Sequence, residues 1–299
     1  MGTPEFAVSS LRALVENDFS VVAVVTAPDK PSGRGLKMSE SPVKQYALSQ
    51  RIPVLQPEKL KSPEFLEHLK SLQADIQIVV AFRMLPEVVW AMPPAGTLNL
   101  HGSLLPQYRG AAPINRVIMN GETVTGVTTF KLQQEIDTGN ILLEESIPIG
   151  PEETAGQLHD RMKEIGAQLV IKTIRGLMDG TLQEKPQQIS SSETLKSAPK
   201  IFTADCEIDW TNPVTQIFNQ IRGLSPVPGA FTQFKGKNLK IFRARMDKNN
   251  HNEKTGLMET DGKSWIRYTA ADGYIYVEEL QLEGKKRMRS TDFLRGYRD

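Results

Sequence analysis

Asn99, His101 and Asp137 are the residues of this 299-residue sequence whose types and spacing best suit chemistry. Asn99 and His101 lie two positions apart in a β-prone segment, so their side chains share one face of the expected strand. Gly102 follows at once and allows a sharp turn with a ligand close to the backbone. Asp137 stands in an Asp-Thr-Gly turn after the next long strand, from which its carboxylate reaches the imidazole if the two strand ends adjoin.

These residue types suit the transfer of an acyl group to a neutral amine. Attack of an amine on a formyl carbonyl develops an oxyanion and a proton-rich nitrogen. The amide of Asn99 can stabilise that oxyanion, assisted by a donor form of the His101 imidazole. A carboxylate beside the imidazole fixes its tautomer and helps carry the proton to the leaving nitrogen. No serine or cysteine nucleophile is needed, because the amine is the nucleophile.

A structural interpretation of the same residues has to be weighed. A single histidine on a strand is usually a hydrogen-bonded structural residue, and an asparagine two positions earlier changes this little. The whole segment NLHGSLLPQYRGAAPI at 99–114, followed by DTG at 137–139, has a polar density that ordinary packing does not need. That density favours catalysis. No metal site is expected, since the four histidines are scattered and Cys206 is the only cysteine.

The elements that must position these residues follow an α/β pattern. Short apolar runs alternate with helical stretches, which indicates βαβ units and an open, mainly parallel sheet. We expect strands at 21–26, 75–82, 97–101 and 124–133, and helices at 41–51, 113–120 and 154–177. In such sheets ligands bind outside the carboxyl ends of the strands.

The last third of the chain has a different pattern. Residues 187–202 are polar and serine-rich, which is typical of a linker. A helix at 214–222 then precedes short strands at 231–234, 239–245, 264–269 and 274–282, separated by Gly, Asp and Asn turns. This pattern predicts a small β-barrel. We therefore expect a catalytic domain at 1–186, a linker at 187–202 and a second domain at 203–299.

Composition places the chain among ordinary globular proteins, with 39% hydrophobic and 24% charged residues. Its apolar runs are too short to cross a bilayer, and no secretory leader is apparent. A single cysteine fits a reducing cytoplasm. The first 202 residues carry 20 Lys+Arg against 22 Asp+Glu, and the remainder 16 against 13. This asymmetry favours a polyanionic partner for the C-terminal part only weakly, because clustered cations are often plain solvated surface.

Five motifs resemble those of the folate-dependent formyltransferase family, and the resemblance runs over nearly the whole chain. The motifs are GTPEFAV at 2–8, PDKPSGRG at 28–35, SPVK at 41–44, HGSLLPQYRGAAPI at 101–114 and EIDW at 207–210. The resemblance implies a Rossmann-like catalytic domain and an OB-like C-terminal domain that binds tRNA. It also implies 10-formyltetrahydrofolate as co-substrate, no metal, and the methionyl amine of initiator methionyl-tRNA as acceptor. We expect a monomer.

The resemblance also implies roles for individual residues. Asn99, His101 and Asp137 would form the catalytic trio. The tetrahydrofolate would lie between two loops, made of Phe82, Arg83, Met84 and Leu85 on one side and Ser103, Leu104, Leu105 and Pro106 on the other. The acceptor end of the tRNA would meet the loop at 27–37 through Lys30, Arg34 and Lys37, with Arg34 inserting. On its residues alone that loop is either a flexible cationic finger suited to phosphates or a solvated surface loop.

Two features depart from the family pattern. Relatives have a short apolar strand just before the GTPEF motif, whereas this sequence starts with MGTPEF. That strand is central in a doubly wound sheet, and losing it removes buried side chains worth roughly 1.5–3 kcal/mol each. We therefore expect a misplaced start or a truncation. The segment AFRMLP at 81–86 carries Arg83 where relatives often have Gly and Tyr nearby, which is expected to alter the lining of the folate pocket.

Other functions remain open at this point. A UDP-amino-sugar N-formyltransferase shares the Asn, His and Asp but needs no cationic finger. A 10-formyltetrahydrofolate hydrolase or dehydrogenase domain would use water in place of the amine, and the EIDW segment favours transfer to tRNA instead. A nicotinamide-dependent oxidoreductase would need a G-x-G-x-x-G turn, whose spacing SGRGLK lacks. A non-catalytic tRNA-binding module is disfavoured by the intact trio.

Overall fold

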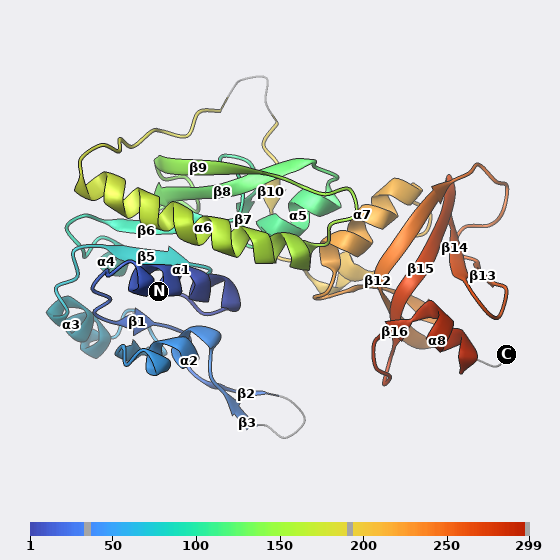
Figure 1. Cartoon of the computed structure of the whole chain (residues 1–299), viewed down its shortest axis with the longest axis horizontal. Helices are drawn as coiled ribbons and strands as arrows, with labels where there is room; N and C mark the ends of the chain where they lie inside the picture. Colours follow the sequence, from blue (N-terminus) through green and yellow to red (C-terminus); the bar gives the residue numbers. More distant parts are fainter. Residues whose placement is uncertain (33–36, 190–193, 297–299) are drawn as a thin grey trace. The chain divides into compact units, whose positions relative to one another are not determined.

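The computed structural model describes residues 1–32, 37–189 and 194–296, and the chain folds into two compact units. The N-terminal unit comprises Met1–Gly110, Gly126–Ile147 and His159–Ser197. The C-terminal unit comprises Ala111–Thr125, Pro148–Leu158 and Ala198–Asp299. Both units are drawn in Figure 1 with their helices and strands labelled. None of the helices within the described residues combines the length and apolar character that a membrane span requires.

The N-terminal unit alternates strands with helices, as its apolar pattern predicts. Its strands are β1 (Val24–Val25), β2 (Lys30–Ser32), β3 (Lys37–Ser39), β4 (Val54–Leu55), β5 (Gln77–Val80), β6 (Thr97–His101), β7 (Arg109–Gly110), β8 (Val124–Lys131), β9 (Ile141–Pro148) and β10 (Ser197–Ala198). Its helices are α1 (Glu5–Glu16), α2 (Pro42–Ser49), α3 (Pro63–Ser71), α4 (Glu87–Trp90) and most of α6 (Ala155–Met178). The expected helix at 41–51 is confirmed as α2, whose first turn is capped by the Ser41 hydroxyl.

The main sheet has the order β5-β6-β8-β9. Strands β5 and β6 are parallel, with Val80 opposite Leu100, whereas β6 and β8 are antiparallel, with His101 opposite Thr128. A second parallel pair joins β1 to β4. The strand expected at 97–101 is confirmed with those bounds, and the Rossmann-like α/β class is confirmed as well.

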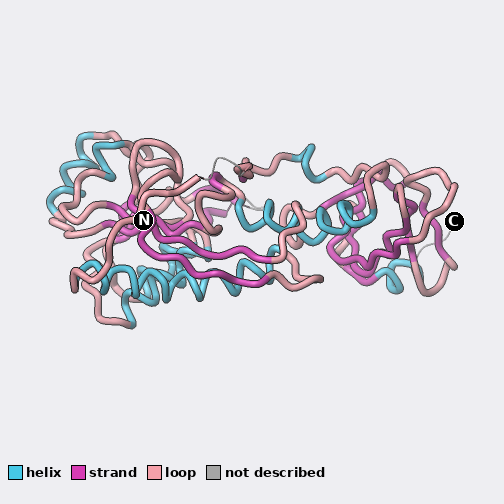
Figure 2. Tube along the Cα trace, turned by 90° about the horizontal axis from the view of Figure 1, so that it is seen from above, coloured by secondary structure: helices cyan, strands magenta, loops and turns pink. Residues whose placement is uncertain are grey.

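Helix α6 covers one face of this sheet (Figures 1 and 2). It comes so close to β6 that a methyl group on Gly166 would lie 2.7 Å from the side chain of Leu100. The hydroxyls of Thr129 and Thr173 also meet at 2.7 Å between β8 and α6. Because side chains alternate along a strand, Asn99 and His101 point to the face of β6 opposite Leu100 and α6.

The expected strand at 21–26 is shorter than predicted, since only Val24 and Val25 pair as β1. Met1 and Gly2 bridge β1 and β5: Gly2 N–H donates to Val25 O at 3.0 Å, and Val80 N–H donates to Met1 O at 3.0 Å. An apolar cavity of about 540 Å³ lies beside this bridge, lined by side chains from α1, β1, β5 and α6. Within the described residues β1 forms a ladder with β4 alone, so it lacks the second ladder that would extend it.

The C-terminal unit is a small antiparallel β-structure with helices. Its sheet has the order β11-β12-β15-β14-β13, and β16 pairs with β15. The strands of this unit are β11 (Ala230–Phe234), β12 (Lys237–Lys248), β13 (Met258–Thr260), β14 (Ile266–Ala270), β15 (Gly273–Leu282) and β16 (Met288–Arg289). Its helices are α5 (Pro113–Met119), α7 (Val214–Leu224) and α8 (Ser290–Arg295), with a 3-10 turn at Thr203–Cys206. The architecture is OB-like, as expected. Its core gathers apolar residues of α7 and four strands, among them Ile217, Leu239 and Ile275.

An ion pair between Arg116 and Asp205 joins α5 to the 3-10 turn of the C-terminal unit. The Asp205 carboxylate accepts from Phe202 N–H at 2.8 Å and pairs with Arg116 at 3.2 Å. The Phe202 N–H first, and then the Arg116 guanidinium, hold the pKa of Asp205 below its ordinary value of 3.8. A depressed carboxyl pKa contributes stability above the ordinary pKa, and this contribution is lost as the pH falls through the folded value.

We therefore predict that Asp205→Asn lowers the free energy of unfolding at pH 7 by about 0.5–1 kcal/mol, because it removes the charge but keeps an acceptor for Phe202 N–H. The difference from the wild type should shrink as the pH falls below 3.8. Urea unfolding at pH 7 and at pH 3 measures it. A difference that persists unchanged at pH 3 would contradict the assignment.

Candidate active site

The site lies at the carboxyl end of β6 in the N-terminal unit. Because β5 and β6 are parallel, the segments that follow them, 81–86 and 102–108, leave the sheet from the same edge. The antiparallel strand β8 starts opposite this edge, with Thr128 beside His101. Two loops and one strand therefore surround the imidazole, and their side chains set what a ligand meets.

His101 is only 6% exposed, and each of its ring nitrogens faces one polar partner. Nε2 lies 2.9 Å from the carbonyl oxygen of Tyr108 and donates to it, since a carbonyl can only accept. Nδ1 faces Asp137 Oδ2 at 3.8 Å, which is longer than a hydrogen bond. The ring of Phe130 meets the imidazole edge-on, with 6.5 Å between centroids. The proton on Nε2 is thereby fixed, and Nδ1 is aimed at the carboxylate.

Asp137 sits at the tip of a constrained turn between β8 and β9. Its backbone is left-handed, with φ of 54°, and its Oδ2 accepts from Gly110 N–H at 2.8 Å. Gly139 lies so close to β8 that an added Cβ would be 1.7 Å from Lys131 O. Lys131 N–H in turn donates to Asn140 O at 3.0 Å, which closes the turn. The sequence led us to expect that Asp137 reaches the imidazole if the two strand ends adjoin. In the structure the end of β8 lies beside Leu98, and the turn itself carries Asp137 to within 3.8 Å of His101.

Asn99 is half-buried on the same face of β6 as His101. Among the described residues its side-chain amide makes no hydrogen bond, so both its N–H groups and its oxygen are available to a ligand. The Asn99 amide thus lies on the same face of β6 as the imidazole, whose Nδ1 faces the Asp137 carboxylate. This arrangement is able to stabilise an oxyanion and to move a proton between two nitrogens.

The loop at 103–106 is fixed by its own buried groups. Ser103 is fully buried and donates to Gln107 O at 2.6 Å. Thr128 Oγ1 donates to Ser103 O at 2.7 Å and accepts from Leu105 N–H at 3.2 Å. Leu105 packs into a cluster with Phe130 and Ile141. The side chains of Ser103 and Leu105 therefore hold the loop in place, whereas Leu104 and Pro106 are half-buried.

The loop at 82–85 presents a mixed surface. Leu85 is buried among Val79 and Val89, Phe82 is half-buried, and Met84 is 72% exposed. Arg83 is exposed, but it donates to Glu58 O at 2.9 Å and also to Pro57 O. Its guanidinium therefore ties this loop to the segment that follows β4. Sequence reasoning identified Arg83 as unusual but did not find these carbonyl partners.

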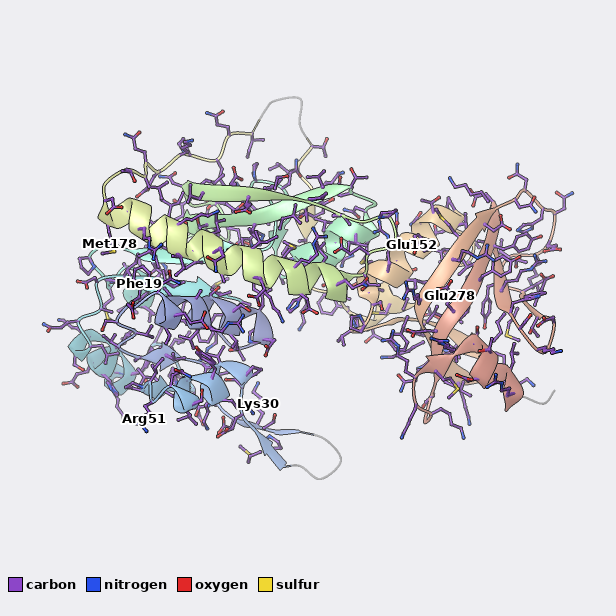
Figure 3. All side chains as sticks on the ribbon, in the orientation of Figure 1. Phe19, Lys30, Arg51, Glu152, Met178 and Glu278 are labelled. Atoms are coloured by element: carbon purple, nitrogen blue, oxygen red, sulfur yellow. The ribbon has the colours of Figure 1, made fainter. Side chains whose placement is uncertain are left out.

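The cationic segment at 27–37 opens as an antiparallel hairpin of β2 and β3, with Lys30 opposite Ser39. Lys30 is exposed at the start of the hairpin (Figure 3). At its base, Asp29 pairs with Lys44 at 2.5 Å and accepts from Gln56 at 2.8 Å. The Lys44 ammonium, and secondarily the Gln56 amide, lower the pKa of the Asp29 carboxyl. Arg34 lies outside the described residues, and Lys37 is the first residue of β3.

Sequence reasoning missed three residues that the structure brings to this site. Tyr108 supplies the carbonyl for His101, and Thr128 supplies the hydroxyl for the 103–105 loop. Gln187, which composition assigned to a linker, donates to the backbone of the Asp137 turn. A backbone carbonyl leaves no trace in residue type, so Tyr108 was not predictable. The first two positions lie in segments already singled out, but nothing in the sequence marked Gln187.

Gly139 offers a test of the turn that carries Asp137. We predict that Gly139→Ala lowers the free energy of unfolding by about 1–3 kcal/mol, because the new methyl group would overlap the backbone of Lys131. Urea unfolding at constant pH measures the change. Gly296→Ala is the control, since a methyl group there meets only Phe293 O at 3.9 Å. Equal stability of Gly139→Ala and the wild type would contradict the close approach.

Comparison with known proteins finds a family match for both the N-terminal and the C-terminal part of the chain. The family model described as formyl transferase matches residues 1–174, and the model described as formyl transferase, C-terminal domain, matches residues 200–298. The sequence is 53% identical to the methionyl-tRNA formyltransferase of Parabacteroides distasonis, over 100% of this chain and 94% of the relative. It is 49% identical to the methionyl-tRNA formyltransferase of Bacteroides fragilis, over 99% and 94%.

Solved structures share the fold at lower identity. An N-formyltransferase from Helicobacter canadensis, in complex with folinic acid and dTDP-3-aminofucose, is 22% identical with a TM-score of 0.67 and coverage of 96% and 97%. HypX from Aquifex aeolicus, in complex with tetrahydrofolic acid, is 18% identical with a TM-score of 0.59 and coverage of 83% and 43%. Both family models match, and relatives of nearly the same length share about half of their residues with this chain. The chain is an enzyme that belongs to the formyl transferase family, among the methionyl-tRNA formyltransferases.

Proposed function

We propose that this enzyme transfers the formyl group of 10-formyltetrahydrofolate to the methionyl amine of initiator methionyl-tRNA, for the initiation of translation. The observation that carries the proposal is the approach of Asp137 to His101, with Asn99 on the same face of β6, in a chain about half identical to methionyl-tRNA formyltransferases. The reaction uses a folate co-substrate and no metal.

The three side chains divide the chemistry of amine attack on the formyl carbon. Asn99 donates its amide N–H to the oxyanion that develops on the formyl oxygen, and the imidazole of His101 lies beside it as the second polar group. The bond from the formyl carbon to N10 of the folate breaks as the new C–N bond forms. The proton lost by the attacking amine passes to N10 through the His101–Asp137 pair, so the overall proton count is unchanged.

The folate is held between the two loops that leave β5 and β6. Phe82, Arg83, Met84 and Leu85 grip the pterin from one side, and Ser103, Leu104, Leu105 and Pro106 line the other. The accessible side chains among these eight, Phe82 and Met84 above all, make apolar contact with the ring. The buried ones keep the loops in place. HypX from Aquifex aeolicus, a structure of similar fold, was solved in complex with tetrahydrofolic acid.

The acceptor tRNA is bound by two cationic surfaces. Lys30, Arg34 and Lys37 of the hairpin segment contact the acceptor end, and basic residues of the OB-like domain contact the tRNA body through its phosphates. The domain boundaries proposed for these roles are 1–186, 187–202 and 203–299. The enzyme acts as a monomer in the cytoplasm, where folate and charged tRNA are found.

A second candidate is formyl transfer to a nucleotide-linked amino sugar, because a solved structure of the same fold binds dTDP-3-aminofucose. The identity to that protein is 22%, against 53% to a methionyl-tRNA formyltransferase. A small sugar nucleotide has no use for the cationic hairpin. A hydrolase that releases formate from the folate would likewise leave the hairpin without a partner.

A competition assay separates these functions. Purified enzyme with 10-formyltetrahydrofolate should formylate methionyl initiator tRNA and leave UDP-aminoarabinose unmodified when both are offered. His101→Ala should lower the turnover number by at least about 10²-fold and retain folate binding measured by calorimetry. The exposed His68→Ala on α3 is the control. Formylation of the sugar alone would overturn the proposal, and full activity of His101→Ala would overturn the mechanism.

The hairpin makes a separate prediction about the acceptor. The double change Lys30→Ala, Arg34→Ala should raise the KM for tRNA with little change in kcat, because phosphate contacts position the substrate without entering the chemistry. The slope of log affinity against log salt should fall by about one for each contact removed. Lys61→Ala, at an exposed lysine outside the hairpin, is the matched control. An unchanged KM would remove the hairpin from tRNA binding.

A further inference from the structure

We infer that Gln187 is a positioning residue for the catalytic pair His101–Asp137, which makes the segment at 184–187 part of the active site. This inference rests on the proposed formyl transfer and adds a residue to its machinery. The side chain of Gln187 donates from Nε2 to Asp137 O at 2.8 Å and to Gly139 O at 2.9 Å. One amide therefore binds both ends of the turn whose carboxylate faces His101.

The other end of the same amide binds the loop that orients the imidazole. Arg109 donates to Gln187 Oε1 from Nε at 3.1 Å and from Nη2 at 2.6 Å. Every donor and acceptor position of the primary amide is thus used. The half-buried Gln187 consequently links the 108–110 loop to the 137–139 turn through a single side chain.

The residues on either side of Arg109 make the two bonds that define the catalytic pair. Tyr108 O accepts from His101 Nε2, and Gly110 N–H donates to Asp137 Oδ2. A shift of Arg109 therefore moves both the acceptor of the imidazole and the donor to the carboxylate. Because Gln187 binds Arg109 and the Asp137 turn together, it fixes the 3.8 Å separation between Nδ1 and Oδ2.

Gln187 is itself held in place by its own segment. Lys185 exchanges both backbone hydrogen bonds with Ile141 at the start of β9, at 2.7 and 2.8 Å. Glu184 accepts from Lys131 at 2.9 Å and from Asn140 at 3.1 Å. Both anchors lie at the two strands that flank the Asp137 turn. The position of Gln187 is therefore set by strand pairing two residues away rather than by the side chain alone.

The turn needs this support because its conformation is unfavourable for an isolated segment. A left-handed backbone, with φ of 54° at Asp137, is uncommon and unfavourable at a residue other than glycine. The carbonyls of Asp137 and Gly139 would also lose their donors if Gln187 were removed. A turn free to relax would hold the carboxylate in several orientations, and only one of these faces Nδ1.

The test uses the full-length enzyme and compares two substitutions at one site. Gln187→Ala should lower kcat by about 10–100-fold, the range typical of residues that orient catalytic groups, with the KM values for folate and tRNA within about 3-fold of the wild type. Gln187→Glu retains an acceptor for Arg109 but presents a carboxylate to two carbonyls. If Gln187 acts by supporting the turn, this variant should lose kcat to a similar extent. If Gln187 acted only by binding Arg109, the variant would keep wild-type kcat.

Gln188→Ala is the matched control, since the neighbouring glutamine is exposed. Wild-type kcat in Gln187→Ala or in Gln187→Glu would overturn the inference. Loss of 5-formyltetrahydrofolate binding together with turnover would also overturn it, because that result marks a general structural role. The wild-type enzyme in the same assay distinguishes failure of the proposed function from failure of the role assigned to Gln187. A wild type that does not formylate methionyl-tRNA overturns the proposed function and the inference with it, whereas an active wild type with fully active variants overturns the inference alone.

Discussion

The pairing of β6 with both of its neighbours is the constraint on which the rest of the site depends. The parallel ladder to β5 sends the two ligand-facing loops out of one edge of the sheet. The antiparallel ladder to β8 sets Thr128 opposite His101 and ends at Lys131 beside Leu98. The turn that follows β8 returns over the strand, where Asp137 binds Gly110 N–H and faces the imidazole. A slip of one residue in either ladder would turn Asn99 and His101 into the face that α6 covers, so register and catalysis are one requirement.

Around that edge, backbone groups do most of the positioning. A carbonyl fixes the His101 proton, an N–H fixes the Asp137 carboxylate, and the backbone of 137–139 is itself held by Gln187. These hydrogen bonds hold the polar loops in place without using the Asn99 amide. Within the described residues that amide therefore remains available to a ligand. Three of the eight expected folate residues, Leu85, Ser103 and Leu105, have buried side chains, which hold the two loops in place.

Sequence reasoning succeeded where a signal is local. Strand β6, helix α2 and the α/β class follow from apolar spacing and capping residues, and the family follows from the shared motif set. It failed where the deciding partner is distant. The expected strand at 21–26 is shortened to Val24–Val25 because strand length depends on neighbouring strands. Composition also gave no sign that Gln187 binds residues 48 and 50 positions away.

The sequence by itself determined the residue types of the chemistry and the family, since both reside in short motifs that are legible without coordinates. Only the tertiary structure decided which nitrogen of His101 carries its proton, how Asp137 is turned toward it, and that Gln187 and Arg109 couple the two loops. These features depend on hydrogen bonds between residues far apart in the chain, and many of the groups involved are backbone atoms. Every residue has those atoms, so their partners are set by the fold rather than by composition.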